Sequence, residues 1–210
     1  MNVTASQVRK ILSRKTVQLA ILCVLAAGMN VALSVLARDV LRLPLFLDTV
    51  FTAAIAFAAG LVPGMIVAVL TMLPPMIYYH TINYFVLCSI AEVALICALK
   101  PVPVVIVRYA SKEKISASYA AIAAKLVVLY IACALGISVL GGVIDTLTRF
   151  LQESHSPWIS VIDVFKPALI MNNLPDLAVN ILARIPTNMV DRFIVIFGGY
   201  AISRLIVKHV

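Results

Sequence analysis

Long apolar runs constrain the fold of this chain more than any other feature of its sequence. Residues 16–37 contain no charged side chain, and neither do residues 62–79. About 20 apolar residues in helical form match the hydrocarbon thickness of a bilayer. The runs are continuously apolar, whereas the strands of a membrane barrel alternate in polarity. We therefore predict an all-α integral membrane protein.

The composition sets how many spans this chain can hold. Of its 210 residues, 63% are hydrophobic and 12% are charged, against roughly 25% charged residues in soluble domains. At about 20 residues per span plus loops, there is room for five to seven spans and no separate soluble domain. We predict a single transmembrane domain over residues 1–210.

We predict six transmembrane helices, over residues 16–37, 45–60, 62–79, 85–99, 118–140 and 188–207. Pro74 and Pro75 are expected to kink the third span or to end it early. A basic segment, residues 1–15, precedes the first span. Residues 141–180 are too polar to span and too apolar for a solvated tail, so we expect one or two amphipathic helices on the membrane face.

Basic residues near the span ends predict the orientation. Six spans place ten of them on the side of the termini: Arg9, Lys10, Arg14, Lys15, Lys100, Arg108, Lys112, Lys114, Arg204 and Lys208. Four fall on the other side: Arg38, Arg42, Arg149 and Lys166. Because Lys and Arg are enriched in cytoplasmic loops, we predict a multi-pass protein of the cell (inner) membrane with both termini cytoplasmic. The same topology explains the net charge of +8 without nucleic acid.

The sequence carries no recognisable catalytic or metal-binding pattern. Its four cysteines lie inside apolar runs without metal-ligand spacing, and its three histidines form no HExxH or nucleophile–base motif. We expect no cofactor, no metal and no enzymatic activity, with Asp48 and Asp191 as a catalytic pair the remaining alternative. A phosphate-binding loop of the Gly-x-x-x-x-Gly-Lys-Ser/Thr type is also missing from the sequence, so we expect no nucleotide site of that kind.

Two aspartates lie about one helical turn inside predicted spans. Asp48 and Asp191 fall near the outer ends of the second and sixth spans, and Arg184, Asn188 and Arg192 lie close to Asp191. Ionisable groups at this depth are costly and usually pair or bind something. Two interpretations stay open: helix-dipole complementation with outward-reaching arginines, or a site that faces a ligand.

Other polar residues extend this candidate site. Glu92 and Lys125 both fall near mid-membrane, where a buried ion pair is expected and ligand contact or a proton path is the alternative. The aromatic loop after the third span is either an interface belt or the lid of a pocket; its residues are Tyr78, Tyr79, His80, Asn83 and Tyr84. Trp158 is an interface anchor or a ligand contact.

Small residues at four-residue spacing allow helices to approach closely. They occur at Ala20, Gly28 and Ala32 in the first span, Ala54 and Ala58 in the second, and Gly64 and Ala68 in the third. They indicate either packing within the chain or a docking face for another membrane subunit.

Two segments carry a resemblance to a known family. "LPLFLDTVFTAAIAFAAGLVPGMIVAVLT", followed after three more spans by "IPTNMVDRFIVIFGGYAISR", resembles the substrate-binding S components of energy-coupling factor (ECF) transporters and ECF-S-like input modules of membrane sensors. The resemblance implies six helices and a pocket near the outer face. Loops after the first, third and fifth spans would cover it. It also implies docking of a coupling subunit on small residues of the first span, where Val24 interrupts the row here.

We therefore expect a receptor subunit that captures a small, water-soluble, vitamin-like micronutrient at the outer face. Its partners would be a transmembrane coupling subunit and ATPase subunits; the alternative is a ligand-sensing input module without transport. The candidate ligand-binding residues are Asp48, Asp191, Arg192, Asn188, Arg184, Tyr79, His80, Asn83, Tyr84, Glu92, Lys125 and Trp158. The sequence does not identify the ligand.

Overall fold

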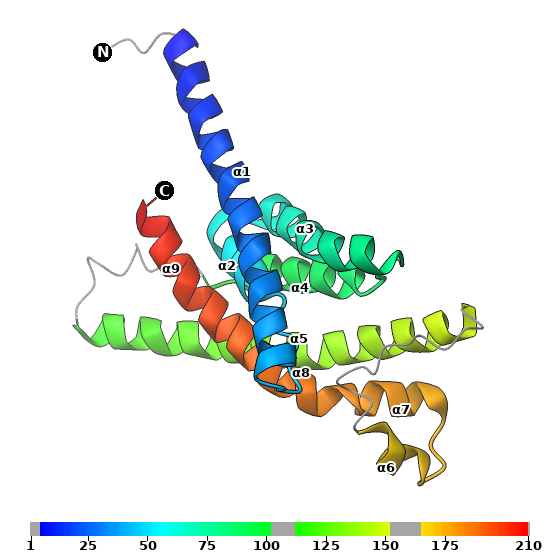
Figure 1. Cartoon of the computed structure of the whole chain (residues 1–210). Helices are drawn as coiled ribbons and strands as arrows, with labels where there is room; N and C mark the ends of the chain where they lie inside the picture. Colours follow the sequence, from blue (N-terminus) through cyan, green and yellow to red (C-terminus); the bar gives the residue numbers. More distant parts are fainter. Residues whose placement is uncertain (1–4, 102–111, 152–164, 210) are drawn as a thin grey trace.

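The computed structural model describes residues 5–101, 112–151 and 165–209 of the chain (Figure 1). All regular elements in these ranges are helices, which confirms the all-α prediction. In order they are α1 (Ala5–Val35), η1 (Leu36–Val40), α2 (Val50–Ala59), α3 (Leu61–Tyr79), α4 (Val86–Leu99), α5 (Lys112–Leu151), α6 (Lys166–Ile170), α7 (Asp176–Leu182), α8 (Arg184–Phe193), η4 (Ile194–Gly198) and α9 (Gly199–His209). The start of α1 and the end of α9 lie toward the same end of the molecule (Figure 1).

Three helices of the described ranges are long and apolar enough to cross a membrane. They are Lys15–Val40, which joins α1 to η1, Leu61–Tyr78 in α3, and Tyr119–Arg149 in α5. α2 and α4 are also apolar but have only 10 and 14 residues. Since a span needs about 20 helical residues, these two helices are too short to cross a bilayer alone.

Several predicted boundaries differ from the observed ones for local reasons. α2 begins at Val50 rather than at residue 45, because residues 41–49 form an irregular loop in which Arg42 and Leu47 have positive φ angles of 51° and 47°. Of the two outcomes expected at Pro74 and Pro75, a kink or an early end, the early end does not occur, since α3 continues through both prolines to Tyr79. The fifth helix continues beyond residue 140 to Leu151.

The predicted amphipathic segment, residues 141–180, divides into different structures. Its first part is the end of α5, and its last part contains the short helices α6 and α7. The last helix begins at Arg184, before the predicted residue 188, and Pro186 occupies its first turn as its fixed φ favours. A π-helical turn, Ile194–Gly198, joins α8 to α9.

Glycine allows close helix contacts at three positions. A Cβ atom built on Gly142 would lie 2.5 Å from Ile181 Cγ1 and 2.9 Å from its backbone, so α7 packs directly on α5. A Cβ on Gly199 would lie 2.8 Å from Ala53 Cβ, where α9 meets α2. A Cβ on Gly64 would lie 2.8 Å from Val93 Cγ1, where α3 meets α4.

The small residues of α2 and α3 therefore pack inside the chain. Ala54, Gly64 and Ala68 are buried and Ala58 is half-buried, so the prediction that they form a docking face is wrong. The row on α1 differs: Ala20, Gly28 and Ala32 are exposed, and a Cβ on Gly28 would meet no atom within 4 Å.

The polarity of α1 is the reverse of that of a helix on a soluble protein. It exposes Val17, Ile21, Val24, Leu25 and Met29. It buries Asn30, which donates to Thr52 Oγ1 (2.9 Å) and Thr71 Oγ1 (3.1 Å) and accepts from the backbone N–H of Phe51 (2.9 Å). Apolar exteriors with polar groups bonded between helices are typical of membrane helices.

Candidate functional site

The same reversal is strongest in α8, which buries its polar side. Arg184, Thr187, Asn188, Asp191 and Arg192 are all buried. Val190 and Phe193 on the other side are each 53% exposed. The buried residues follow the three- and four-residue spacing of one helical face. We name these five residues the α8 stripe.

The end of the stripe at Asp191 and Arg192, which we call its inner end, belongs to an ionic network formed by α8, α4 and the loop before α2. Arg192 Nη1 donates to Glu92 Oε2 (2.5 Å) and to Thr49 Oγ1 (2.7 Å), and Arg192 Nη2 lies 3.3 Å from Asp191 Oδ2. Asp48 stands next in the chain to Thr49 and interacts electrostatically with Arg192, Asp191 and Glu92. We name Asp48, Thr49, Glu92, Asp191 and Arg192 the inner network.

Asp191 also holds the loop between η1 and α2. Its Oδ1 accepts the backbone N–H groups of Phe46 (3.2 Å) and Leu47 (2.9 Å), which are about 145 positions away in sequence. Leu47 has a positive φ, a conformation that costs a non-glycine residue free energy unless its surroundings support it. The carboxylate therefore fixes loop 41–49 against α8.

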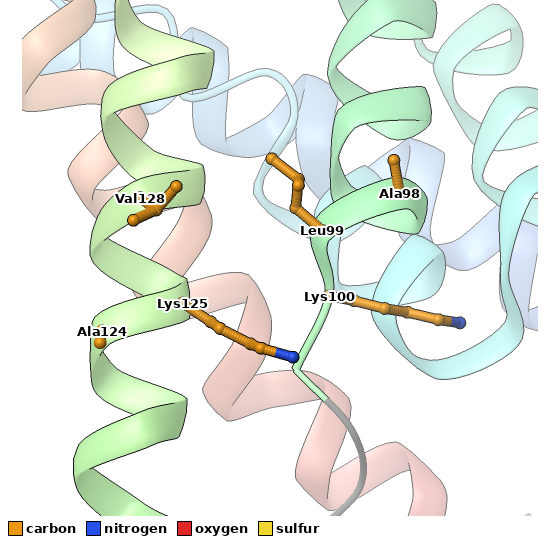
Figure 2. Close-up of a pocket in the computed structure, with 6 residues that line it drawn as sticks. All are labelled: Ala98, Leu99, Lys100, Ala124, Lys125 and Val128. Carbon is orange, nitrogen blue, oxygen red and sulfur yellow. The ribbon is translucent and has the colours of Figure 1, made fainter.

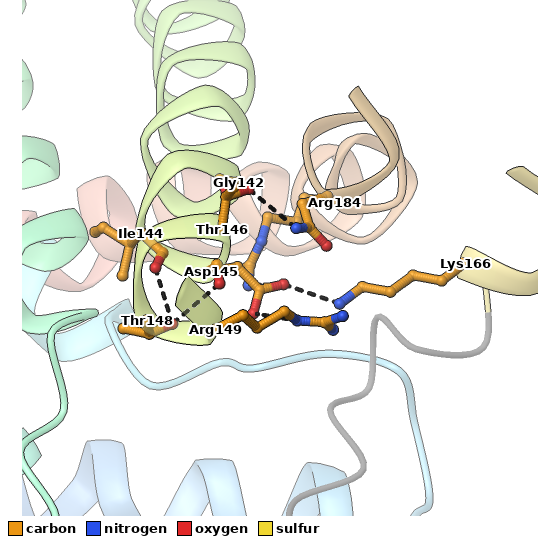
Figure 3. A network of polar contacts seen from close by, with 9 residues as sticks. Gly142, Ile144, Asp145, Thr146, Thr148, Arg149, Lys166 and Arg184 are labelled. Atoms are coloured by element: carbon orange, nitrogen blue, oxygen red, sulfur yellow. Dashed lines mark hydrogen bonds and ion pairs between the residues drawn. The ribbon is translucent and has the colours of Figure 1, made fainter. Parts of the chain in front are cut away.

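The other end of the stripe, at Arg184, is called its outer end. It belongs to a second charged group, centred on Asp145 of α5. Asp145 Oδ2 lies 2.8 Å from Lys166 Nζ and 3.4 Å from Arg184 Nη2, and Asp145 Oδ1 lies 3.6 Å from Arg149 Nε. Figure 3 shows these side chains converging on the one carboxylate. We name Asp145, Arg149, Lys166 and Arg184 the outer cluster. Arg184 also stacks over the ring of Phe85, with Cζ 4.7 Å from the centroid.

Between the two ends, the stripe faces the middle of α5. Asn188 donates to Ser138 Oγ at 2.9 Å. Thr187 is 3% exposed, and its Oγ1 has no hydrogen-bond partner in the described ranges. In the inner network the same holds for Glu92 Oε1, Asp191 Oδ2 and Arg192 Nε. Since nearly all buried polar atoms in proteins are hydrogen-bonded, these atoms can bind water or a ligand.

Lys125 does not belong to this site. The predicted Glu92–Lys125 ion pair is wrong, because Glu92 pairs with Arg192 while Lys125 is exposed. On α5 the inward positions are taken by Leu126 and Leu129, one residue out of register with Lys125. Lys125 instead lines a surface pocket between α4 and α5, together with Lys100 (Figure 2).

Most of the residues predicted from the aromatic loop after α3 lie at the surface rather than in the α8 stripe. His80 and Tyr84 are exposed, and Tyr78 is 76% exposed. Asn83 accepts from the backbone N–H of Phe85 (3.0 Å) and lies 3.5 Å from Met72 Sδ, so its side chain acts at the start of α4. The side chain of Tyr79 and all of Trp158 lie outside the described residues.

Several residues of the site were not predicted. Asp145, Thr49, Ser138 and Thr187 are not among the residues that the sequence pattern indicates. The three- and four-residue spacing of polar residues from 184 to 192 was a visible signal for the stripe. The partners of the stripe were not visible, because they come from α4, α5 and an irregular loop.

Chemically, this arrangement is able to bind polar groups. It combines carboxylates, guanidinium groups, an amide and a hydroxyl in a desolvated setting, where each polar contact is stronger than in water. Among the described residues, no group of three or more His, Cys, Asp or Glu side chains could hold a metal ion. Comparisons with protein-family models, with curated proteins and with solved structures find no match to this chain.

Proposed function

We propose that this chain is the substrate-binding subunit of an ECF-type transporter, which captures a small, water-soluble, vitamin-like compound from outside the cell. The observation that carries the proposal is the α8 stripe. Five polar residues, three of them charged, are buried side by side in an otherwise apolar membrane-type protein. Such groups in a membrane protein usually line the path or the site of a polar ligand.

The loops of the protein support a site at α8. Loop 41–49 is bonded to Asp191 through two backbone N–H groups. The loop after α3 reaches Arg184 through Phe85. The segment after α5 reaches the outer cluster through Lys166. Loop 41–49 and the loop after α3 therefore contact α8 directly, and Lys166 reaches it through Asp145, so a ligand at α8 would lie close to all three connections.

The proposal includes a six-span topology with both termini cytoplasmic. The run from α8 to α9 has bounds Arg184 and His209 and would extend roughly 39 Å at 1.5 Å per residue, long enough to cross. α2 is short, so loop 41–49 would lie at membrane depth. Irregular backbone is tolerated there only where protein groups satisfy it, as Asp191 does for Phe46 and Leu47.

Transport would require a coupling subunit and ATPases, which this chain would meet through α1. The exposed row Ala20, Gly28 and Ala32 offers a flat surface, and Val24 within it is also exposed. Small residues allow a partner helix to approach closely. Docking there would lie away from the α8 stripe, so that ligand and partner bind to different helices.

The first experiment is a mild-detergent purification of the tagged protein from its own membranes, with mass spectrometry of the retained proteins and small molecules. We expect a polytopic membrane partner, one or two ATPases and one retained compound. A kinase-like partner, or a retained compound without any ATPase, would instead favour a sensing module.

Three variants connect the retained compound to the site. Asp48→Ala and Asn188→Ala should reduce retention while expression stays normal, because both residues belong to the inner network or the stripe. Asp39→Ala is the matched control, since this carboxylate is exposed and pairs with Arg38 at the end of η1. Equal retention by all three variants would show that the site is elsewhere.

A further inference from the structure

The inner network has an excess of negative charge. It contains the carboxylates of Asp48, Glu92 and Asp191 and a single cation, Arg192. Glu92 is 1% exposed, Asp191 is fully buried and Arg192 is 5% exposed. Burying ionised groups without matching opposite charge is strongly unfavourable. Asp48 is half-buried. One guanidinium group cannot compensate three ionised carboxylates, so the network is balanced either by a proton on a carboxyl group or by a further positive charge.

A second observation concerns unsatisfied acceptors in the network and beside it on α8. Glu92 Oε1 is a buried acceptor without a hydrogen-bond partner in the described ranges, and Asp191 Oδ2 has only the ion-pair contact with Arg192 Nη2 at 3.3 Å. Thr187 lies one turn before Asp191 on the same face of α8, and its buried hydroxyl is also without a partner there. A hydroxyl and two carboxylate oxygens are the acceptors that an N–H-rich cation requires.

We infer that the inner network binds a cationic, hydrogen-bond-donating group of the ligand, of the ammonium or guanidinium class, between Glu92, Asp191 and Thr187. This inference rests on the proposed function of the α8 stripe as a ligand site. A bound ammonium group brings the network to within one charge of neutrality and donates to acceptors that are otherwise unsatisfied. An anionic group at the same place would add to the excess of negative charge.

The outer cluster does not compete for this cation. There the cations Arg149, Lys166 and Arg184 surround one carboxylate, Asp145. The two ends of the stripe therefore differ in sign, and a positively charged ligand group is attracted to the inner end. The separation along α8, from Arg184 to Asp191, is roughly 10 Å at 1.5 Å per residue.

The test uses the purified full-length chain in detergent and three probes that share one ring: benzylamine as the cation, benzyl alcohol as the neutral analogue and benzoate as the anion. Binding is measured by calorimetry and by the shift in the thermal unfolding midpoint. We expect benzylamine to bind and to raise the midpoint, with no comparable effect of the other two. Benzoate preferred over benzylamine, or benzyl alcohol equal to it, overturns the inference.

Variants assign any benzylamine binding to the network. Glu92→Gln should weaken it roughly thirtyfold, the loss expected for a buried charge-assisted contact. Asp48→Asn and Thr187→Val should weaken benzylamine binding roughly tenfold. Neither change breaks the Arg192 ion pairs, so these two variants test the cation site even if Glu92→Gln fails to fold. Asp39→Asn is the control. Equal affinity in Asp48→Asn, Thr187→Val and Asp39→Asn overturns the inference.

The charge of the compound retained on purification distinguishes failure of the cation site from failure of the proposed function. A neutral or anionic compound that is retained by the wild-type chain and lost in Asn188→Ala leaves the proposed function standing and overturns the cation site. If no compound is retained and none of the three probes binds, both fail. A retained amine or guanidine lost in Asp48→Asn supports both.

Discussion

The two charged groups on α8 are built from the same parts and have opposite balance. Each joins an arginine of α8 to a carboxylate on another helix: Arg192 to Glu92 on α4, and Arg184 to Asp145 on α5. The inner network has three carboxylates for one cation and side chains no more than 6% exposed in its ion pairs. The outer cluster has three cations for one carboxylate, which is 17% exposed.

From this comparison we infer that the burial of the carboxylates, more than the number of ion pairs, decides how much each charged group contributes to stability. The outer cluster lies where α6 and α7 meet α5, and partial exposure lets water screen its charges. The inner network is sealed by α2, α4 and α8, where a lost partner leaves a charge uncompensated. The outer cluster therefore holds the start of α6 to α5 through Lys166 and Asp145, and we expect the inner network to contribute more to the stability of the fold.

The largest effect is expected from Arg192→Ala. It leaves the carboxylates of Glu92 and Asp191 buried without their cation, which costs about 3–5 kcal/mol of unfolding free energy. We expect a large drop in the thermal unfolding midpoint, measured in detergent by size-exclusion fluorescence.

The control for this variant is Arg38→Ala, because Arg38 also pairs with an aspartate but both side chains are about half exposed. Its midpoint should match that of the wild-type chain. If Arg192→Ala unfolds at the wild-type temperature as well, the inner network is not sealed, and the contrast between the two groups disappears.

Asp191→Ala should have the next largest effect. It removes the acceptor of the Phe46 and Leu47 N–H groups, and hydrogen bonds to a charged acceptor contribute about 1.5–3 kcal/mol. We expect a loss of about 2–3 kcal/mol and faster hydrogen exchange in a peptide covering residues 41–49.

Asp191→Asn removes the negative charge of the side chain but keeps an oxygen that can accept hydrogen bonds. Its amide oxygen can still accept both backbone N–H groups, so exchange in residues 41–49 should stay close to that of the wild-type chain while stability falls. Equally fast exchange in Asp191→Asn and Asp191→Ala would mean that charge, rather than the hydrogen bonds, holds the loop.

Much of the fold was predictable from the sequence because its signals are local. The apolar runs at residues 16–37 and 62–79 correspond to α1 and α3, since length and composition alone define such helices. Residues 45–49 were predicted as the start of a span rather than as part of the loop, because Leu45, Phe46 and Leu47 are as apolar as a span. What keeps them irregular is a contact with Asp191, far away in sequence.

The site was predictable in its members on α8 but not in its pairing. Asp191, Arg192, Asn188 and Arg184 were all singled out from the sequence, and all four are buried on one face. Glu92 was assigned to Lys125 because both lie mid-span, whereas partner choice depends on helix rotation. One residue of register on α5 turns Lys125 outward and Leu126 inward, and apolar composition carries almost no information on that rotation.

Asp145→Asn tests the outer cluster with a smaller expected effect. The variant keeps the volume and removes the charge that Lys166 Nζ and Arg184 Nη2 approach at 2.8 and 3.4 Å. Partial exposure reduces the cost to about 1–2 kcal/mol. α6 and α7 should exchange faster in hydrogen-exchange mass spectrometry, while residues 41–49 remain protected. Loss of protection in both regions would show that the two groups form one unit.

Arg149→Gln should have the smallest effect, and it sharpens the comparison inside the outer cluster itself. Arg149 lies four residues after Asp145 on α5, at 3.6 Å, with 59% of its side chain exposed. Exposed pairs at this helical spacing contribute about 0.3–0.5 kcal/mol, so the unfolding midpoint should barely change and the small change should vanish in high salt.

Lys166→Gln is the matched variant, since Lys166 reaches the same carboxylate from a side chain only 7% exposed. A larger loss in Lys166→Gln than in Arg149→Gln is expected from the greater burial and the shorter contact of Lys166, 2.8 Å against 3.6 Å, although both variants remove one cation from Asp145. Equal losses would mean that the number of cations around the carboxylate matters and their depth does not, which contradicts the basis on which the inner network is assigned its larger role.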